Sequence, residues 1–580
     1  MKFEKRAPQL RLKLEGWRSR VVLGLATLGF LVLAGRAVYL QGMNQQFLQA
    51  KGEARYGRVV EMPASRGPVL DRNGQMLALS TPVESICVTP DDWEADDAAV
   101  KRLAAALGMD AGEIRQKIAN KDRQFVFLKR QIAPEQAAKV MALHVPGVFL
   151  QREYRRFYPA GEVMAHVVGF TGIDDNGQEG IELAQQKRLA GVAGSRKVIK
   201  DRKGNIVEDV ASLRVPRDGE AVTLAIDQRL QFLAHRELRN AVAANGARAG
   251  SIVILDAKTG EVMALVNMPD YNPNNRANVT GKQTRNRSVT DLFEPGSTLK
   301  PFTVAAALDS GLVKPDTLIQ TAPGSMAIGG WTISDSHPFG VLSVAQVIQK
   351  SSNVGTAKIQ LSMTAERMGT LYRELGFGAV PATGFPGEAK GLLRPWTQWR
   401  PIEQATMSYG HGISVSLLQV ARAYTVFTNE GQLLPLALLK REARPIGKPL
   451  FTKDTTREIV RMMEMAVSPG GTAPRAAVPG YRVGGKTGTA HKAEAGGYAE
   501  HKYVSSFVGF APVSNPRFIV AVMIDEPSGT KYYGGDIGAP VFSTVMGAAL
   551  RMMSVPPDAP GIPGAPGTIN AQARDTRGEG

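Results

Sequence analysis

The sequence predicts an α+β protein of two or three domains behind a single transmembrane helix. The chain has 580 residues, of which 43% are hydrophobic, so it can fill more than one sizeable core. An uncharged apolar run lies close to the N-terminus, at residues 21–35. After it, stretches that alternate apolar and polar residues around turns are mixed with amphipathic helical stretches, which indicates both strands and helices.

The apolar run reads VVLGLATLGFLVLAG, and the RAVYL that follows extends it to the length of one membrane crossing. We expect a signal anchor at residues 21–40, with the basic residues 1–20 in the cytoplasm and the rest of the chain exported. The alternative is a signal peptide cleaved at Gly35-Arg36-Ala37, where the central arginine is unfavourable. The charged residues ahead of the run are Lys2, Lys5, Arg6, Arg11, Lys13, Arg18 and Arg20, against Glu4 and Glu15.

Residues 41–217 indicate mixed structure without an obvious nucleophile. Residues 64–80 alternate around an Asn-Gly pair, which predicts a β-hairpin, and residues 198–210 predict a second one. Residues 97–142 are expected to form short amphipathic helices. The single cysteine, Cys87, excludes a disulfide within the chain and lies in a predicted strand, ESICVTP, so we assign it no function.

A second folded domain is expected over residues 218–555. Here DGEAVTLAI leads into a strongly amphipathic helix, DQRLQFLAHRELRNAVAANG, which Gly246 closes. The tail at residues 556–580 begins PPDAPGIPGAPG. Because it is so rich in proline and glycine, we expect it to be disordered.

The chain is basic, with 70 Lys and Arg residues against 53 Asp and Glu residues and a formal net charge of +17. This charge suits an anionic membrane surface, an acidic cell-wall polymer or nucleic acid. The sequence has no zinc-finger spacing, no aromatic ribonucleoprotein motif and no dense basic helix, so no nucleic-acid partner is expected. The histidines show no metal-binding spacing, so neither a metal nor another cofactor is predicted.

The stretch EPGSTLKPF, residues 294–302, places Ser297 three positions before Lys300. The preceding Pro-Gly and the following apolar run predict a helix that begins here, so both side chains should share a face. Pro301 is tolerated within the first turn. A neutral lysine amine could then take the serine proton, which makes Ser297 a candidate nucleophile.

A second Ser-x-x-Lys occurs at Ser528 and Lys531, in DEPSGTKYYGG. It follows the predicted strand FIVAVMI, and its glycines indicate a loop, so the serine and lysine have no helical reason to face each other. We therefore expect this copy to be incidental.

Two further elements support Ser297. QKSSNVGTAKIQL contains Ser351-x-Asn353, the only Ser-x-Asn in the chain, and VGGKTGTA contains Lys486-Thr487-Gly488 followed by Thr489, after an apparent strand at residues 481–485. Another Lys-Thr-Gly at residues 258–260 lies between two apolar strands and ahead of the serine, and is better explained as a hairpin turn.

The ordered set of Ser-x-x-Lys, Ser-x-Asn and Lys-Thr-Gly resembles the signature of penicillin-binding proteins and serine β-lactamases. RGPVLDRNGQMLA, GQEGIE, LDAKTGEVMALV, FEPGSTLKPF, SYGHGISVSLLQ and YYGGDIGAPVF extend this resemblance to class B penicillin-binding proteins over most of the chain. The resemblance implies a transpeptidase domain with an antiparallel sheet flanked by helices at residues 218–555. It also implies an elongated pedestal or dimerisation-type domain at residues 41–217.

Under this resemblance, the enzyme is a peptidoglycan D,D-transpeptidase. Ser297 would attack the penultimate D-alanine of a stem peptide and form an acyl-enzyme, which the amine of a second stem resolves. Lys300 would be the base, with a pKa lowered by burial and by Lys486. Ser351 would relay a proton to the leaving group and Asn353 would orient the donor amide. The implied substrate-binding residues are Thr487 and Thr489, which hold the carboxylate, and Gly488, with the N–H groups of Ser297 and Thr489 as the oxyanion hole.

Rival functions fit the sequence less well. A β-lactamase would use the same residues, but no Glu-x-x-Leu-Asn lies between the second and third motifs. A membrane-anchored β-lactam sensor would usually carry several membrane spans. The sequence has no Gly-x-Ser-x-Gly motif, which would supply the nucleophile of a serine–histidine triad. A structural role is therefore expected for His411. Residues 41–217 have neither room nor a motif for a glycosyltransferase.

The stretch SSNVGTAKIQL resembles the septal, division-specific penicillin-binding protein 3 type, whereas elongation-type proteins commonly have aspartate where Asn353 stands. The septal role is therefore expected, with elongation as the alternative. The implied location is the bacterial inner membrane, crossed once, with the catalytic domain in the periplasm. The implied partners are peptidoglycan stem peptides and lipid-linked precursors, β-lactam antibiotics, the membrane, a septal glycosyltransferase of the shape, elongation, division and sporulation family, and other division proteins.

Overall fold

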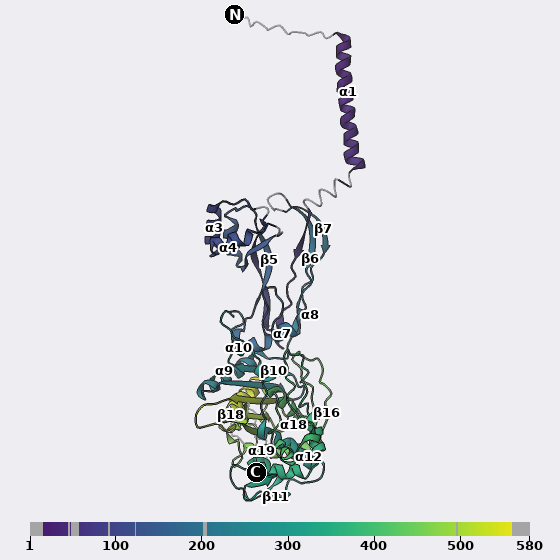
Figure 1. The fold of residues 1–580 in the computed structure, drawn as a ribbon. Coiled ribbons are helices and arrows are strands. Elements are labelled where there is room, and N and C mark those ends of the chain that lie inside the picture. Colours follow the sequence, from purple (N-terminus) through teal and green to yellow (C-terminus); the bar gives the residue numbers. More distant parts are fainter. Residues whose placement is uncertain are drawn as a thin grey trace, which may run out of the picture. The chain divides into compact units, whose positions relative to one another are not determined.

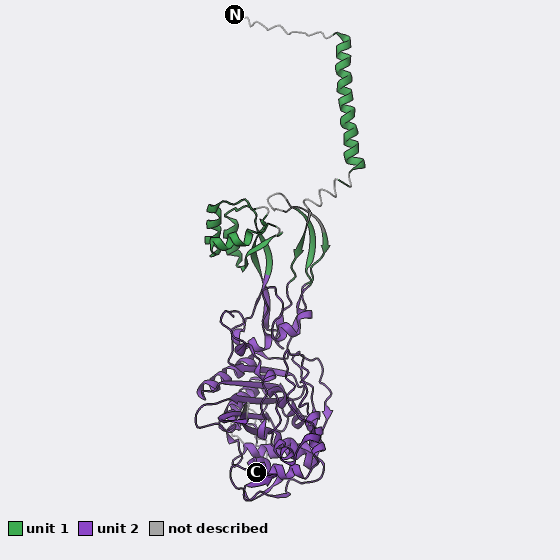
Figure 2. Ribbon diagram, viewed as in Figure 1, with its two compact units in different colours: residues 1–64, 82–153, 192–217 green, residues 65–81, 154–191, 218–580 purple. Residues whose placement is uncertain are grey.

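The computed structural model describes residues 15–44, 47, 57–90, 93–121, 123, 125–200, 206–494 and 497–559, and Figure 1 labels its elements. The chain forms two compact units. Residues 1–64, 82–153 and 192–217 make the first, and residues 65–81, 154–191 and 218–580 make the second (Figure 2). The predictions for the first 14 residues and for residues 560–580 lie outside the described residues.

In the first unit, the apolar run forms helix α1 (Gly16–Val38), which continues as a π-helical turn, η1 (Tyr39–Met43). Residues 16–43 have a mean hydropathy of 2.1 in their most apolar window, and none of that window is buried. Within the described part of the chain, this is the one helix long and apolar enough to cross a membrane. It fits a single membrane anchor.

The rest of the first unit contains a small sheet and a helical cluster. Strands β1 (Gly57–Met62), β6 (Gly194–Lys200) and β7 (Ile206–Arg214) form an antiparallel sheet in that order, so the hairpin expected at residues 198–210 is confirmed, with its turn outside the described residues. The helices are α3 (Asp97–Leu107), α4 (Ala111–Ile118) and α5 (Pro134–Met141), and they pack around Leu103 and Ile114.

The prediction of helices throughout residues 97–142 is wrong in the middle. Residues 126–132 form a strand, β4 (Val126–Ile132), which pairs with the C-terminal half of β3 (Met76–Val88). Alternate side chains of β4, including Val126 and Leu128, point into the same core as the helices. The alternating run of β4 has only seven residues, so the sequence did not distinguish it from the amphipathic helices on either side. Cys87 is buried on β3, as expected.

The second unit is built on a five-stranded antiparallel sheet. Its strand order is β10 (Val262–Met268), β9 (Ala249–Asp256), β19 (Phe518–Asp525), β18 (Gly497–Ala511) and β17 (Gly484–Glu494). Every residue of β9, β10 and β19 is buried. Because successive side chains point to opposite faces, both faces of the central sheet must be covered.

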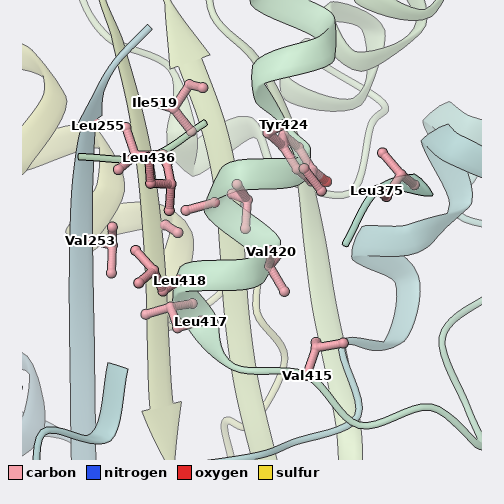
Figure 3. Packing of buried hydrophobic residues seen from close by; sticks show 14 of the residues in the cluster. Val253, Leu255, Leu375, Val415, Leu417, Leu418, Val420, Tyr424, Leu436 and Ile519 are labelled. Carbon is pink, nitrogen blue, oxygen red and sulfur yellow. The ribbon is translucent and has the colours of Figure 1, made fainter. Parts of the chain in front are cut away.

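Two layers of helices cover these faces. Ile252 and Ile254 of β9 pack with α9 (Gln228–Ala244) and α20 (Gly538–Met552), whereas Val253 and Leu255 pack in the larger core with α17 (Leu417–Ala423) (Figure 3). Alternate side chains of β9 therefore contribute to two different hydrophobic cores, one on each face of the sheet. Helix α9 agrees with its prediction, because Asp227 caps its start and Gly246 follows its end with a φ of 50°.

Helices and short strands of the second unit complete the large core and the flank of the sheet. The expected hairpin at residues 64–80 is confirmed as β2 (Val69–Leu70) paired antiparallel with β3, and β8 (Val222–Thr223) lies parallel to β2. Strand β5 (Val148–Phe157), whose residues 148–153 belong to the first unit, also pairs with β3. The short antiparallel pairs are β11 (Leu318–Gln320) with β14 (Val341–Ser343), β12 (Ser325–Ile328) with β13 (Trp331–Ser334), and β15 (Gln432–Leu433) with β16 (Lys448–Pro449).

The other helices of this unit are η3 (Gly161–Val163), α6 (Ala165–Val168), α7 (Gly180–Ala184), α8 (Gln186–Leu189), α10 (Gly281–Thr284), α11 (Arg287–Thr290), η4 (Gly296–Leu299), α12 (Lys300–Asp309), α13 (Val344–Lys350), α14 (Asn353–Leu361), α15 (Ala365–Glu374), η5 (Trp396–Gln398), α16 (Pro401–Met407), α18 (Thr425–Thr428), α19 (Lys453–Val467) and η6 (Pro474–Ala476). Past α20, Asp558 accepts hydrogen bonds from the backbone N–H groups of Arg482 at 2.7 Å and Ser514 at 3.0 Å. The first residues of the predicted tail are therefore held against the domain.

Candidate active site

Ser297 lies on a short 3₁₀ turn, η4, that leads directly into α12. The turn is largely buried, but Ser297 itself is partly exposed while Thr298 and Leu299 are covered. Pro295 precedes the turn, and Pro301 lies in the first turn of α12, where its missing N–H costs no helical hydrogen bond. The local sequence therefore presents one hydroxyl on a fixed turn.

Two glycines let neighbouring segments approach this turn. A Cβ at Gly488 of β17 would lie 2.3 Å from Ser506 Oγ and 2.8 Å from the carbonyl oxygen of Pro295. Gly410 has a φ of 83°, and a Cβ there would lie 2.3 Å from the carbonyl oxygen of Gly296. Strand β17 and the loop that contains Gly410 thus hold the serine turn from two sides, at distances that no other residue permits.

Lys300 is completely buried, and its amine points at the second motif. Nζ donates to Asn353 Oδ1 at 2.8 Å, to Ser351 Oγ at 3.1 Å and to the carbonyl oxygen of Ser351. Ser351 follows α13 with a φ of 58°, a left-handed conformation that is unfavourable for serine and that turns both of its oxygens toward Lys300. Within the described part of the chain, no hydrogen bond joins the side chains of Ser297 and Lys300.

Lys486 approaches the same hydroxyl from the sheet. It is completely buried, and its Nζ donates to Ser351 Oγ at 2.9 Å and to Thr487 Oγ1 at 3.2 Å. The third motif was predicted to follow a strand at residues 481–485, whereas it lies inside β17, paired with β18 through Lys486–Thr489. Its place on the edge strand leaves one side of the β17 backbone unpaired by the sheet.

Burial shifts the titration of both lysines. It lowers the pKa of Lys300 well below the ordinary value of a lysine, and the neighbouring positive charge of Lys486 lowers it further, while Asp335 opposes the change. Burial lowers the pKa of Lys486 to about 7. A neutral amine can accept a proton, so this pair can provide a base at neutral pH.

Asp335 is a site residue that the sequence analysis missed. It follows β13, and its carboxylate accepts hydrogen bonds from Ser352 Oγ at 2.7 Å, from Val354 N at 3.0 Å and from Asn353 N. These bonds cap helix α14 and fix the second motif. The amide of Asn353 also donates to the carbonyl oxygen of Ser334 at 2.9 Å, which leaves its Oδ1 facing Lys300.

The remaining predicted residues lie along β17. Thr487 Oγ1 donates to Thr472 Oγ1 at 3.3 Å, and Thr489 Oγ1 accepts from Gly534 N at 3.0 Å. All eight predicted site residues are therefore brought together by η4, α12, the turn before α14 and β17. Within the described residues, no group of three or more His, Cys, Asp or Glu side chains is placed to hold a metal ion.

The competing serine and Lys-Thr-Gly lie elsewhere in the fold, and within the described residues no hydrogen bond joins the His411 side chain to a serine. Ser528 Oγ donates to the carbonyl oxygen of Asn245 at 3.3 Å, from a loop after β19. The Lys-Thr-Gly at residues 258–260 forms the turn between β9 and β10, where Asp256 accepts from the N–H groups of Lys258 and Thr259. His411 lies 5.1 Å from the Tyr409 ring, and burial lowers its pKa to about 4, so its imidazole is neutral.

A partly exposed serine beside two buried lysines, at the edge of an antiparallel sheet that helices cover on both faces, defines a serine acyltransferase of the penicillin-recognising class. Residues 250–547 match the family described as Penicillin binding protein transpeptidase domain, and residues 61–224 match the Penicillin-binding Protein dimerisation domain. The chain belongs to the penicillin-binding protein transpeptidase family, as a class B member. The resemblance stated from the sequence and the expected fold class are confirmed.

Relatives of known name agree. The probable peptidoglycan D,D-transpeptidase PenA of Neisseria gonorrhoeae is 45% identical over 546 residues, which are 93% of this chain and 94% of that one. The peptidoglycan D,D-transpeptidase FtsI of Escherichia coli (strain K12) is 41% identical over 552 residues, 94% of this chain and 93% of that one. An apo structure of the TP domain from Burkholderia pseudomallei penicillin-binding protein 3 is 48% identical, with a TM-score of 0.54 over 58% of this chain and 98% of that chain.

Proposed function

We propose that this chain is a peptidoglycan D,D-transpeptidase that cross-links stem peptides through an acyl-enzyme on Ser297, and that β-lactams inhibit it by acylating the same serine. The observation that carries the proposal is the meeting of two buried amines, Lys300 at 3.1 Å and Lys486 at 2.9 Å, on the hydroxyl of Ser351 beside the serine turn. Two fully buried lysines that form no ion pair with a carboxylate of the described residues disfavour each other's charge, which makes one of them a base.

In the acylation step, Ser297 Oγ attacks the carbonyl carbon of the penultimate D-alanine, and the neutral amine of Lys300 takes its proton. The bond to the terminal D-alanine breaks, and its nitrogen receives a proton through Ser351, whose hydroxyl lies between the two lysines. Lys486 keeps this hydroxyl in a positive field. The neutral amine of a second stem then attacks the ester carbonyl, the bond to Ser297 Oγ breaks, and a proton of the amine passes to Oγ to restore the serine.

The other predicted residues bind the donor. Asn353 orients the donor amide, Thr487 and Thr489 hold the terminal carboxylate, and Gly488 lets the substrate approach the strand closely. The backbone N–H groups of Ser297 and Thr489 form the oxyanion hole, a contribution of roughly 3 kcal/mol to the barrier for each donor. This assignment is supported by the location of Ser297 on η4 and of Thr489 on the edge strand β17.

We further propose the septal role. Asn353 stands where elongation-type proteins commonly have aspartate, and the relative FtsI supports the same assignment. The proposed partners are a septal glycosyltransferase of the shape, elongation, division and sporulation family and other division proteins. The proposed topology has residues 1–20 in the cytoplasm, one inner-membrane span at residues 21–40, a pedestal at residues 41–217 and a periplasmic transpeptidase domain at residues 218–555.

Two measurements on the full-length protein test the activity. A synthetic stem peptide ending in D-Ala-D-Ala, with an amine-bearing acceptor peptide, should yield a cross-linked product and free D-alanine. The mass adduct left by penicillin should persist for hours, because no Glu-x-x-Leu-Asn of the class A β-lactamase kind lies between the second and third motifs. Rapid loss of the adduct would indicate a β-lactamase, and a stable adduct without turnover of the peptide would indicate a sensor.

A further inference from the structure

Glu294 is a partly buried carboxylate three residues before Ser297, and the mechanism above does not use it. Its Oε1 accepts a hydrogen bond from the backbone N–H of Gly412 at 2.8 Å. The hydroxyl of Tyr498 lies 3.1 Å from Oε1 and 3.0 Å from Oε2 and donates its single proton to one of them. A carboxylate has about four acceptor positions, so about two remain free at Glu294.

No lysine or arginine within the described part of the chain forms an ion pair with Glu294. By contrast, Glu182, a fully buried carboxylate of the same unit, pairs with Arg66 and Arg156, each at 2.6 Å. Burial raises the pKa of Glu294, while the Gly412 N–H and the Tyr498 hydroxyl oppose the change. A desolvated negative charge that lacks a partner gains most from a cation that arrives with a ligand.

The side chains around Glu294 suit such a cation. The ring of His411 lies 6.2 Å from that of Tyr498 and 5.1 Å from that of Tyr409. Because burial lowers the pKa of His411 to about 4, this imidazole does not repel a positive charge at neutral pH. Phenol rings and a neutral imidazole beside a carboxylate favour ammonium groups.

The location also fits a reactant. Three residues span at most about 11 Å of chain, so Glu294 lies within reach of a molecule that contacts Ser297. The Nζ of Lys300 lies 5.9 Å from the ring centre of Tyr409. The rings of Tyr409, His411 and Tyr498 therefore form a row between the catalytic lysine and Glu294. The one reactant that must arrive as a cation is the acceptor, because a primary amine is protonated in water.

We propose that the Glu294 carboxylate, with His411 and Tyr498 beside it, binds the ammonium group of the acceptor and takes one of its protons. The free amine then attacks the Ser297 ester, and a second proton passes from the nitrogen to Ser297 Oγ as the ester bond breaks. The inference rests on the proposed transpeptidase function and assigns the acceptor to a class: a primary amine on an unbranched side chain, charged when it binds. The terminal carboxylate of the donor is bound separately, at Thr487 and Thr489. Donor and acceptor would therefore bind through different groups.

The test compares a charged with an uncharged nucleophile. The full-length protein is acylated with a depsipeptide donor that ends in D-Ala-D-lactate and releases D-lactate, in the presence of Nα-acetyl-lysine amide and of hydroxylamine, which is neutral at pH 7. Glu294→Gln keeps an acceptor oxygen for Gly412 but removes the charge, so the ratio of lysine-amide product to hydroxylamine product should fall about tenfold. A ratio within twofold of the wild-type value, in a variant that penicillin still labels, would overturn the proposal.

The control variant is Glu388→Gln. Glu388 is also partly buried and accepts a hydrogen bond at 2.6 Å from Thr383 Oγ1, five residues earlier in the same loop. Within the described residues it forms no hydrogen bond or ion pair with Glu294, His411 or Tyr498, so its loss of charge should leave the ratio unchanged. Failure of the wild-type protein to form any acyl-enzyme would instead refute the transpeptidase proposal itself.

A second measurement needs no variant and covers the case in which Glu294→Gln does not fold. Nα-acetyl-trimethyl-lysine amide is a cation that cannot react, and it should suppress the lysine-amide product while sparing the hydroxylamine product. Its uncharged isostere, with a tert-butyl group in place of the trimethylammonium group, should have little effect. Equal inhibition by both compounds, or none by either, would contradict a carboxylate subsite.

Discussion

Replacing Lys486 by glutamine should raise the pKa of Lys300. The acid limb of the pH–rate profile for acylation should therefore move to higher pH. Both amines donate to Ser351 Oγ, at 3.1 and 2.9 Å, so they lie no more than about 6 Å apart. Two unit charges at that distance repel by about 3 kcal/mol at an effective dielectric constant of 20. The positive charge of Lys486 lowers the pKa of Lys300, and its removal reverses that effect.

The acid limb moves to higher pH because Lys300 acts as a neutral base. The rate of acylation rises with pH as Lys300 loses its proton, so a higher pKa moves the rise to higher pH, by about two pH units for a repulsion of this size. The assay is the second-order rate constant of penicillin acylation, measured across pH. The plateau should also fall, because Ser351 loses a hydrogen bond, but the position of the limb is the diagnostic quantity.

Two further variants bracket this result. Asp335→Asn should move the limb to lower pH, because the carboxylate of Asp335 raises the pKa of Lys300. Lys350→Gln is the matched control, since Lys350 is not in the site and its amine donates to the carbonyl oxygen of Gly470 at 2.9 Å. A limb that stays in place or moves to lower pH in Lys486→Gln would refute the coupling between the two lysines.

The remaining predictions concern the base and the strand. Lys300→Arg keeps the charge but cannot lose a proton in the useful range, so acylation should slow by at least about a hundredfold; near-normal acylation would exclude the role of base. Gly488→Ala should slow acylation by about tenfold or more, since the new Cβ would lie 2.8 Å from the carbonyl oxygen of Pro295 and force η4 and β17 apart. Gly281→Ala, where a Cβ meets nothing within 4 Å, should leave the rate unchanged.

The catalytic cluster could be predicted because its chemistry is encoded locally. Ser297 and Lys300 are separated by one turn, and the surrounding prolines, glycines and apolar residues indicate where that turn begins. The decoy serine, Ser528, could be set aside for the same reason, because glycines around it indicate a loop. The order of the three motifs then supplied the resemblance, from which the roles of Ser351 and Lys486 were taken.

Other features of the site depend on contacts that spacing does not reveal. Asp335 lies 18 positions from Asn353 and reaches its backbone only because β13 returns beside the start of α14. Glu294 adjoins the first motif, but its lack of a cationic partner is visible only once the side chains around it are placed. In the first unit, β4 was missed because its short alternating run lies between amphipathic helices and is stabilised by pairing with β3.

The identity of the acylated residue decides whether Ser297 is the nucleophile. The full-length protein is treated with penicillin and digested, and the modified peptide is located by mass spectrometry. We expect one adduct, on the peptide that contains Ser297. Ser297→Ala should carry no adduct, whereas Ser528→Ala should be labelled like the wild-type protein. An adduct on Ser528, or labelling that survives Ser297→Ala, would contradict the account.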